Sequence, residues 1–174
     1  MNSTDLRDFP PFYTLQRVET TRARQLDLWT KLVLREGLPN GQSTFSIDIS
    51  SFLPFSNPKI SRAMDMEGRR AVGDALVQSQ NAKWEDVSKT RLLLSARTID
   101  AWAAVIYSWA GETGRIGGSP STVYEIYSGE DSESTELYNL HPDVCLKALQ
   151  ALQKQGKAII IQGDSVDSTG VKFI

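Results

Sequence analysis

Two short stretches of the chain follow the same order of residue types, and this repetition limits the possible folds more than any other feature. Both LVQSQNAKWE, around Asn81, and ALQKQGKAII, around Gly156, have the pattern of a helix end, a small turn residue and the start of a strand. Asn81 and Gly156 are 75 residues apart in a chain of 174 residues. Because this length suffices for two small domains, the repetition predicts two domains of one architecture.

The first half alternates between helical and extended patterns. Leu26, Trp29 and Val33 are spaced by three and four positions, which predicts one buried helix face. A later helix is expected to bury Val77, although Gly73 lowers its helix propensity. The elements expected here are a helix over 20–36, a strand over 45–49, helical turns over 59–64, a helix over 67–79 and a hairpin of 82–85 with 91–95.

The second half repeats this order. Pro142 suits the first position of a helix, and Gly156 suits its C-terminal stop. The expected elements are a helix over 98–113, a short apolar element over 122–128, an acidic loop over 129–135, a helix over 142–155 and a hairpin of 158–162 with 170–174.

This order of elements is typical of a winged helix, and two copies fit the chain without a long linker. The expected fold class is therefore α+β and mainly helical. We expect an extended N-terminal arm over 1–19, a first winged-helix domain over 20–97 and a second over 98–174.

Few residues suit catalysis or metal binding. The sequence has one histidine and one cysteine, His141 and Cys145. Pro142 places His141 at the helix cap, whereas Cys145 continues into the apolar face of Leu149, so we expect a capping histidine and a core cysteine. The glycine-rich stretch 111–118 follows a helix and lacks the Lys-Ser/Thr ending of a phosphate-binding loop. We therefore expect that the protein is not an enzyme and that it binds no cofactor and no metal.

Charge is divided unevenly along the chain. The net charge is −2, with +3 up to Arg97 and −5 in the remainder. Arg69 and Arg70 lie on the helix that a winged helix would place in DNA, but acidic residues accompany them. Nucleic-acid binding needs a concentrated basic face, so it is the weaker alternative. The longest apolar run, 101–107, is too short to cross a bilayer, and a single cysteine suits a reducing compartment.

The stretch DFPPFYTLQ near the N-terminus is rich in aromatic residues and prolines. Proline fixes its own φ and biases the preceding residue toward extended conformations, so Pro10 and Pro11 favour a stiff arm. Phe9, Phe12 and Tyr13 could pack on their own domain or dock on another protein. The third possibility is a WW-domain ligand, because PPFY satisfies the PPxY pattern.

Blocks along nearly the whole chain resemble a known family. They are PPFYTLQ, TTRARQLDLW, LVL, PFSNPKISR, NAKWEDVSKTR, WAAVIYSWAGETG, STVYEIYSGED, LKALQALQKQGKA and GVKFI, in this order. Their ordered set is similar to the vacuolar protein-sorting-associated protein 25 family, the small subunits of the endosomal sorting complex ESCRT-II. The resemblance implies two winged-helix domains and no catalysis.

The resemblance also implies partners. It implies a Y-shaped heterotetramer with two copies of this subunit and one each of vacuolar-sorting subunits 22 and 36. The arm and first domain would dock on a larger subunit, and the second domain would recruit the ESCRT-III subunit vacuolar-sorting 20. The complex would sort ubiquitinated cargo into multivesicular bodies. It would be cytoplasmic and recruited to endosomal membranes, and this subunit would contact the membrane only indirectly, through the complex.

With the resemblance, we expect Phe9, Pro10, Pro11, Phe12 and Tyr13 to bind a larger subunit. Replacing Phe12 and Tyr13 with alanine should then leave the monomer's stability nearly unchanged and weaken assembly. The acidic second half should attract the basic N-terminal helix of an ESCRT-III subunit and speed their encounter.

Overall fold

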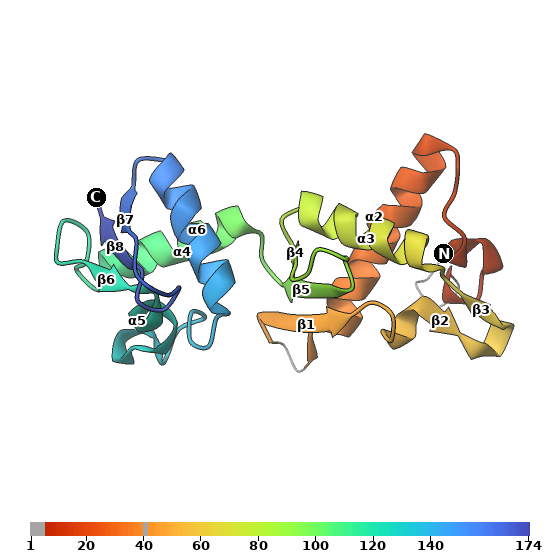
Figure 1. Cartoon of the computed structure of the whole chain (residues 1–174), viewed down its shortest axis with the longest axis horizontal. Helices are drawn as coiled ribbons and strands as arrows, with labels where there is room; N and C mark the ends of the chain where they lie inside the picture. The colour runs from red at the N-terminus through yellow and green to blue at the C-terminus, as the bar shows by residue number, and fades with distance from the viewer. Residues whose placement is uncertain (1–5, 40–41) are drawn as a thin grey trace. The chain divides into compact units, whose positions relative to one another are not determined.

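The structure, a computed structural model, describes residues 6–39 and 42–174 and divides into two compact units (Figure 1). The first unit ends at Ala96, and the second begins at Arg97. Each unit combines helices with a three-stranded antiparallel sheet, so the expected mixture of helix and sheet is confirmed. No helix within the described residues is long and apolar enough to cross a membrane.

In the first unit, the long helices and the hairpin lie within one or two residues of their expected bounds. The strand order is β1-β5-β4, so β5 is the central strand. The elements are η1 (Pro10–Tyr13), α2 (Glu19–Gly37), β1 (Thr44–Asp48), η3 (Leu53–Phe55), β2 (Ser56–Asn57), η4 (Pro58–Ile60), β3 (Arg62–Ala63), α3 (Met66–Gln78), β4 (Ala82–Trp84) and β5 (Arg91–Ser95).

The helical turns expected over 59–64 are only partly present. One 3₁₀ turn, η4, ends at Ile60, and Ser61 then adopts a left-handed conformation with φ of 53°. This residue reverses the chain, so that Arg62 pairs with Asn57 in the two-stranded sheet β2-β3. The expectation was wrong for 62–64 because a two-residue strand leaves almost no periodic signal in the sequence.

Helix α3 packs against the hairpin more closely than its sequence indicates. Val72 and Leu76 are fully buried, as expected. Val77, also expected in the core, is 36% exposed, because it lies about 100° around the helix from Leu76. A Cβ atom at Gly73 would lie 2.3 Å from Cζ2 of Trp84, so the glycine provides space for the indole despite its low helix propensity.

In the second unit, α4 and α6 pack side by side (Figure 1). The short element expected over 122–128 is a two-residue strand followed by a helix. The strand order is β6-β8-β7, with β8 in the centre. The elements are α4 (Ile99–Glu112), β6 (Ser121–Thr122), α5 (Val123–Ser128), η5 (Glu130–Ser132), α6 (Pro142–Lys154), β7 (Ala158–Ile161) and β8 (Gly170–Phe173).

Helix α6 confirms the expected roles of its end residues. Pro142 occupies its first turn, and Nδ1 of His141 accepts a hydrogen bond from the backbone N–H of Asp143 at 3.2 Å. Gly156, just after the helix, has φ of 74°, which few residues other than glycine adopt readily. Cys145 is completely buried, and burial raises the pKa of its thiol to about 12.

We expect the thiol of Cys145 to be unreactive in the folded protein. The thiolate is the nucleophile, and both the raised pKa and the burial keep it scarce and inaccessible. Alkylation by iodoacetamide, followed by mass spectrometry, should therefore be at least about a hundredfold slower in buffer than in guanidinium chloride. Equal rates in the two solutions would show that the thiol is accessible in the native state.

Candidate functional site

The aromatic N-terminal segment is folded onto the first unit. Residues Pro10–Tyr13 form the 3₁₀ turn η1, and the side chains of Phe12 and Tyr13 are only 5% and 3% exposed. The expectation of an extended arm is therefore wrong for this turn, and residues 1–5 of that arm lie outside the described part. The φ that proline imposes suits a helical turn as well as an extended chain, so burial of the rings decides between them.

Trp29 of α2 receives both buried rings. The ring of Phe12 stacks on the indole with centroids 4.4 Å apart and planes 8° apart. Tyr13 meets the same indole edge-on, with centroids 5.6 Å apart. Nε1 of Trp29 donates a hydrogen bond to the carbonyl oxygen of Phe12 at 2.9 Å. Phe12 and Tyr13 thus pack on their own unit. This is one of the alternatives that the sequence left open.

A buried glutamine, which the sequence analysis missed, fastens the turn. Nε2 of Gln25 donates to the carbonyl oxygens of Phe12 and Thr14, at 3.0 and 2.8 Å. Its Oε1 accepts from the backbone N–H of Gln16 at 3.0 Å. Gln25 precedes Trp29 by four positions on α2, so a polar residue on the buried helix face was the available signal.

A second set of polar contacts joins the residues before the turn to the segment around Asn57. The hydroxyl of Tyr13 and the amide of Asn57 both donate to the carbonyl oxygen of Arg7, at 2.9 and 2.7 Å. Nζ of Lys59 lies 2.9 Å from a carboxylate oxygen of Asp8. Hydrogen bonds from Lys59 and Asn57 lower the pKa of Asp8, and the same carboxylate raises the pKa of Lys59. The ion pair is exposed, so its contribution to stability is small.

The outer side of the turn remains accessible. Phe9 is 47% exposed, Pro10 and Pro11 are exposed, and Leu28 of the adjoining α2 is 39% exposed. A shallow cavity of about 370 Å³ lies between Leu6, Phe9, Pro11 and Leu28. We call Phe9, Pro10, Pro11 and Leu28 the docking surface. It keeps three of the five residues expected from the sequence and adds Leu28, while Phe12 and Tyr13 support it from inside.

The same geometry weakens the WW-domain alternative. A PPxY ligand has to present its tyrosine to the binding domain. The ring of Tyr13 is 3% exposed and its hydroxyl already donates to the carbonyl oxygen of Arg7. Recognition of PPFY by a WW domain would therefore require the turn to leave its own unit.

Arg69, one of the two arginines considered for nucleic-acid binding, points into the first unit. Its guanidinium donates to the carbonyl oxygens of Ile49, Ser50 and Met64, each at 2.8 Å, and lies over the ring of Phe55. Burial lowers the pKa of Arg69, yet a guanidinium stays protonated in proteins. The guanidinium is buried and its Nε and Nη1 donate inside the unit, so helix α3 offers less positive charge to a phosphate backbone than its sequence indicates.

The described residues do not gather metal ligands. Within 6–39 and 42–174, no three His, Cys, Asp or Glu side chains lie together in a way that could hold a metal ion. His141 caps α6 with its ring nitrogen, and Cys145 lies in the core.

Solved structures share this fold. A crystal structure described as subunit VPS25 of the endosomal trafficking complex ESCRT-II matches all of this chain and all of its own, with a TM-score of 0.77 and 18% identity. A chain in the crystal structure of the endosomal complex ESCRT-II (VPS22/VPS25/VPS36) likewise matches over both full lengths, with a TM-score of 0.71 and 18% identity. At this identity the likeness establishes the fold.

Sequence comparisons establish the family. Vacuolar protein-sorting-associated protein 25 of Xenopus laevis is 38% identical over 95% of this chain and 94% of its own length. The protein of the same name from Homo sapiens is 38% identical over 95% and 93%, and that of Arabidopsis thaliana is 34% identical over 95% and 92%. The model of the family described as ESCRT-II complex subunit matches residues 7–141. Because both kinds of match span most of the chain, as the ordered sequence blocks predicted, this protein belongs to the family of ESCRT-II complex subunits.

Proposed function

We propose that this chain is a non-catalytic adaptor subunit of an ESCRT-II complex, built from two winged-helix domains. Its first domain docks on the larger vacuolar-sorting subunits 22 and 36. Family membership supports this proposal, as does a similar chain in a solved structure described as VPS22/VPS25/VPS36. The presence in each unit of helices and a three-stranded antiparallel sheet supports the winged-helix part of the proposal. The observation that carries the docking role is the ordered apolar surface around Phe9.

The docking surface has the properties of an anchor for a partner. Phe9 is half-exposed beside two exposed prolines, and the turn beneath it is fixed by the buried Phe12 and by Gln25. Because the turn is already ordered, little backbone entropy remains to be lost when a partner binds. An exposed aromatic side chain next to a cavity is a common centre of binding energy.

The second domain would serve the other half of the adaptor role. We propose that it recruits the ESCRT-III subunit vacuolar-sorting 20, so that ubiquitinated cargo is sorted into multivesicular bodies at endosomal membranes. The charge of −5 over residues 98–174 supports this assignment, because an acidic domain attracts a basic partner and speeds association. Contact with the membrane would be indirect, through the other subunits.

The docking role predicts a separation between assembly and stability. Replacing Phe9 and Leu28 together with alanine should weaken binding to the larger subunits about 30-fold or more. The free energy of unfolding should change by less than about 2 kcal/mol, because both side chains are partly exposed and truncating them leaves no enclosed cavity. Titration calorimetry with the co-expressed larger subunits and urea unfolding of the free chain measure the two quantities.

Val87→Ala is the matched control, since Val87 is a fully exposed apolar residue at the tip of the β4–β5 hairpin, away from the docking surface. It should leave both binding and stability unchanged. If the Phe9 and Leu28 variant bound the larger subunits as tightly as the wild type, the docking surface would lie elsewhere. If the wild type failed to bind them, the adaptor role itself would be wrong.

A further inference from the structure

The shallow cavity beside the docking surface has a single charged side chain on its rim. Among the described residues that line this cavity, Arg24 of α2 is the only charged one. Arg24 is exposed and precedes Leu28 of the docking surface by four positions, so the two side chains are neighbours on one face of the helix. A partner that covers Leu28 and fills the cavity therefore also comes close to the guanidinium of Arg24.

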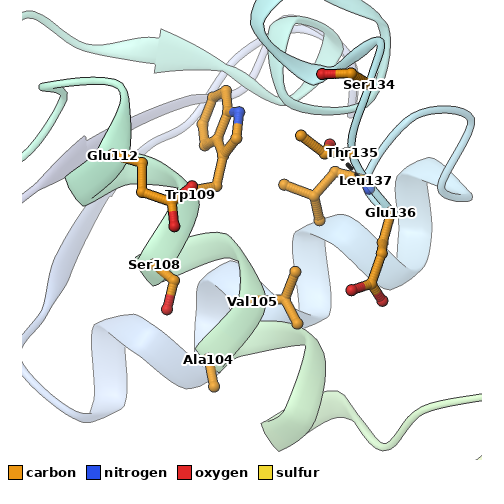
Figure 2. Close-up of a pocket in the computed structure, with 9 residues that line it drawn as sticks. All are labelled: Ala104, Val105, Ser108, Trp109, Glu112, Ser134, Thr135, Glu136 and Leu137. Carbon is orange, nitrogen blue, oxygen red and sulfur yellow. Dashed lines mark hydrogen bonds between the residues drawn. The ribbon is translucent and has the colours of Figure 1, made fainter.

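The second unit has a cavity of the opposite charge. It measures about 460 Å³ and lies between α4 and residues 134–137 (Figure 2). Among the described residues that line it, the charged ones are Glu112 and Glu136. Glu136 forms an ion pair with Arg97, so Glu112 in particular would repel a carboxylate. The sign of a ligand's charge therefore decides which of the two cavities suits it.

The amide side chains that line the first cavity are already used by the N-terminal turn. Nε2 of Gln16 donates to the carbonyl oxygens of Pro11 and Thr14, at 3.1 and 2.8 Å. Nε2 of Gln25 donates to the carbonyl oxygens of Phe12 and Thr14. Both amides hold the turn in place, so neither is the group that would select a ligand.

The guanidinium of Arg24 is not used in this way. Within residues 6–39 and 42–174 it forms no ion pair and donates no hydrogen bond to another described residue. The acidic residue one turn further along α2, Asp27, lies 2.9 Å from Nζ of Lys31 instead. Arg24 therefore presents the five donors of its planar fork to solvent, beside an apolar cavity.

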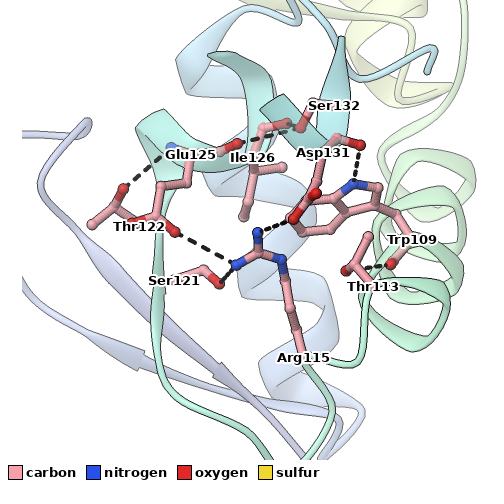
Figure 3. A network of polar contacts seen from close by, with 9 residues as sticks. All are labelled: Trp109, Thr113, Arg115, Ser121, Thr122, Glu125, Ile126, Asp131 and Ser132. Carbon is pink, nitrogen blue, oxygen red and sulfur yellow. Dashed lines mark hydrogen bonds and ion pairs between the residues drawn. The ribbon is translucent and has the colours of Figure 1, made fainter. Parts of the chain in front are cut away.

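Other arginines of the chain direct the same fork inward. Nη2 of Arg115 lies 2.7 Å from a carboxylate oxygen of Asp131, and Nη1 donates to the hydroxyl of Ser121 at 2.8 Å (Figure 3). The guanidinium of Arg115 also lies over the ring of Trp109, 4.6 Å from the centroid. The contacts of Arg115 and of the buried Arg69 serve the fold itself, whereas Arg24 contributes no such contact.

We infer that Arg24 recognises a carboxylate of the partner that binds the docking surface, so that the surface selects an apolar segment with an Asp or Glu side chain. The guanidinium fork matches the two oxygens of a carboxylate. A partner that covers the cavity removes water from Arg24, and a desolvated guanidinium without an anion is costly. The cost falls on every partner that lacks the carboxylate, which is how a charge gives specificity.

The inference rests on the docking role proposed above and adds the charge that the larger subunit has to present. Substitutions of Arg24 in the full chain test it, by titration calorimetry with the co-expressed larger subunits at low and at high salt. At low salt, Arg24→Gln should weaken binding by about tenfold and Arg24→Glu by about a hundredfold. The loss caused by Arg24→Gln should shrink at high salt, because salt screens the charge pair in the wild type.

A zero-length cross-link would identify the carboxylate. Arg24→Lys keeps the charge but loses the fork, so this variant should bind about threefold more weakly than the wild type and more tightly than Arg24→Gln. Treating its complex with a carbodiimide should join the introduced amine to the partner's carboxylate as an amide. Mass spectrometry of the cross-linked peptides then names the Asp or Glu residue of the larger subunit.

Arg91→Gln is the matched control, since it removes the same charge from an exposed arginine of the β4–β5 hairpin. It should change the affinity by less than about twofold, and thermal unfolding checks that every variant is folded. Equal losses from Arg91→Gln and Arg24→Gln would show that the overall charge of the first unit, and not Arg24, attracts the partner. If Arg24→Gln bound the larger subunits as tightly as the wild type at both salt concentrations, docking would stand but the role of Arg24 would be wrong. If the wild type did not bind them, the docking role would fall together with the inference.

Discussion

Replacing Phe12 and Tyr13 together with alanine should lower the free energy of unfolding of the first unit by at least about 4 kcal/mol. Both side chains are buried against Trp29, and large-to-small changes at such positions lose transfer free energy and leave a cavity. The two losses will not simply add, because the rings contact each other with centroids 6.0 Å apart. This expected result reverses what the sequence alone indicated, which was a nearly unchanged stability.

Urea unfolding followed by circular dichroism measures this loss. Phe9→Ala is the matched control, since it removes a half-exposed aromatic ring from the same segment and should cost less than about 1 kcal/mol. If the double variant unfolded at the same urea concentration as the wild type, the turn would not be part of the core in solution. A loss of assembly in the double variant would not locate the docking surface, because unfolding alone would cause it.

The second large effect is expected at Arg69. Changing Arg69 to methionine keeps much of the apolar stem but removes every hydrogen bond that the guanidinium makes to the carbonyls of Ile49, Ser50 and Met64. Buried acceptors without donors are costly, and the three bonds involve a charged group, so the free energy of unfolding should fall by roughly 2–4 kcal/mol. Urea unfolding of the full chain measures the change.

Arg70→Met is the control for this change, because it removes the same charge one position further along α3. Arg70 is only partly buried, and its Nε makes a single long hydrogen bond of 3.4 Å to the carbonyl oxygen of Lys89. Its substitution should cost less than about 1 kcal/mol. Equal effects of the two substitutions would mean that the charge of α3 matters and the internal hydrogen bonds do not.

The elements that could be predicted are those whose signals are local. The helices α2, α3, α4 and α6 have apolar residues at helical spacing and recognisable end residues, such as Pro142 and Gly156 in α6. The bounds of these helices depend on residues that are close in sequence, so hydrophobic periodicity is enough to predict them. The strand pair β2-β3 could not be predicted, since it depends on the left-handed conformation of Ser61 and has two residues on each side.

The candidate site was only partly predictable. The composition of PPFY indicated that the segment was unusual, and its outer residues do form an exposed surface. The sequence did not indicate Gln25, because a polar residue on a helix face is ordinarily read as solvent-exposed. It also placed Arg69 on the helix considered for DNA binding, where the side chain would have to be exposed. Both polar side chains are buried because each donates hydrogen bonds to several backbone carbonyl oxygens, and that match exists only after folding.

By itself, the sequence of this protein determined two successive helix-and-sheet units, a core cysteine, a capping histidine and membership of the ESCRT-II subunit family. These depend on periodicity, on end residues and on an ordered set of blocks, all of which are properties of the linear chain. The tertiary structure decided which side of the N-terminal turn faces inward. Trp29 lies 17 positions beyond Phe12 in sequence but offers it a flat apolar surface and an N–H donor. The φ that the two prolines impose suits both an extended chain and a turn, and burial against this distant partner selects the turn.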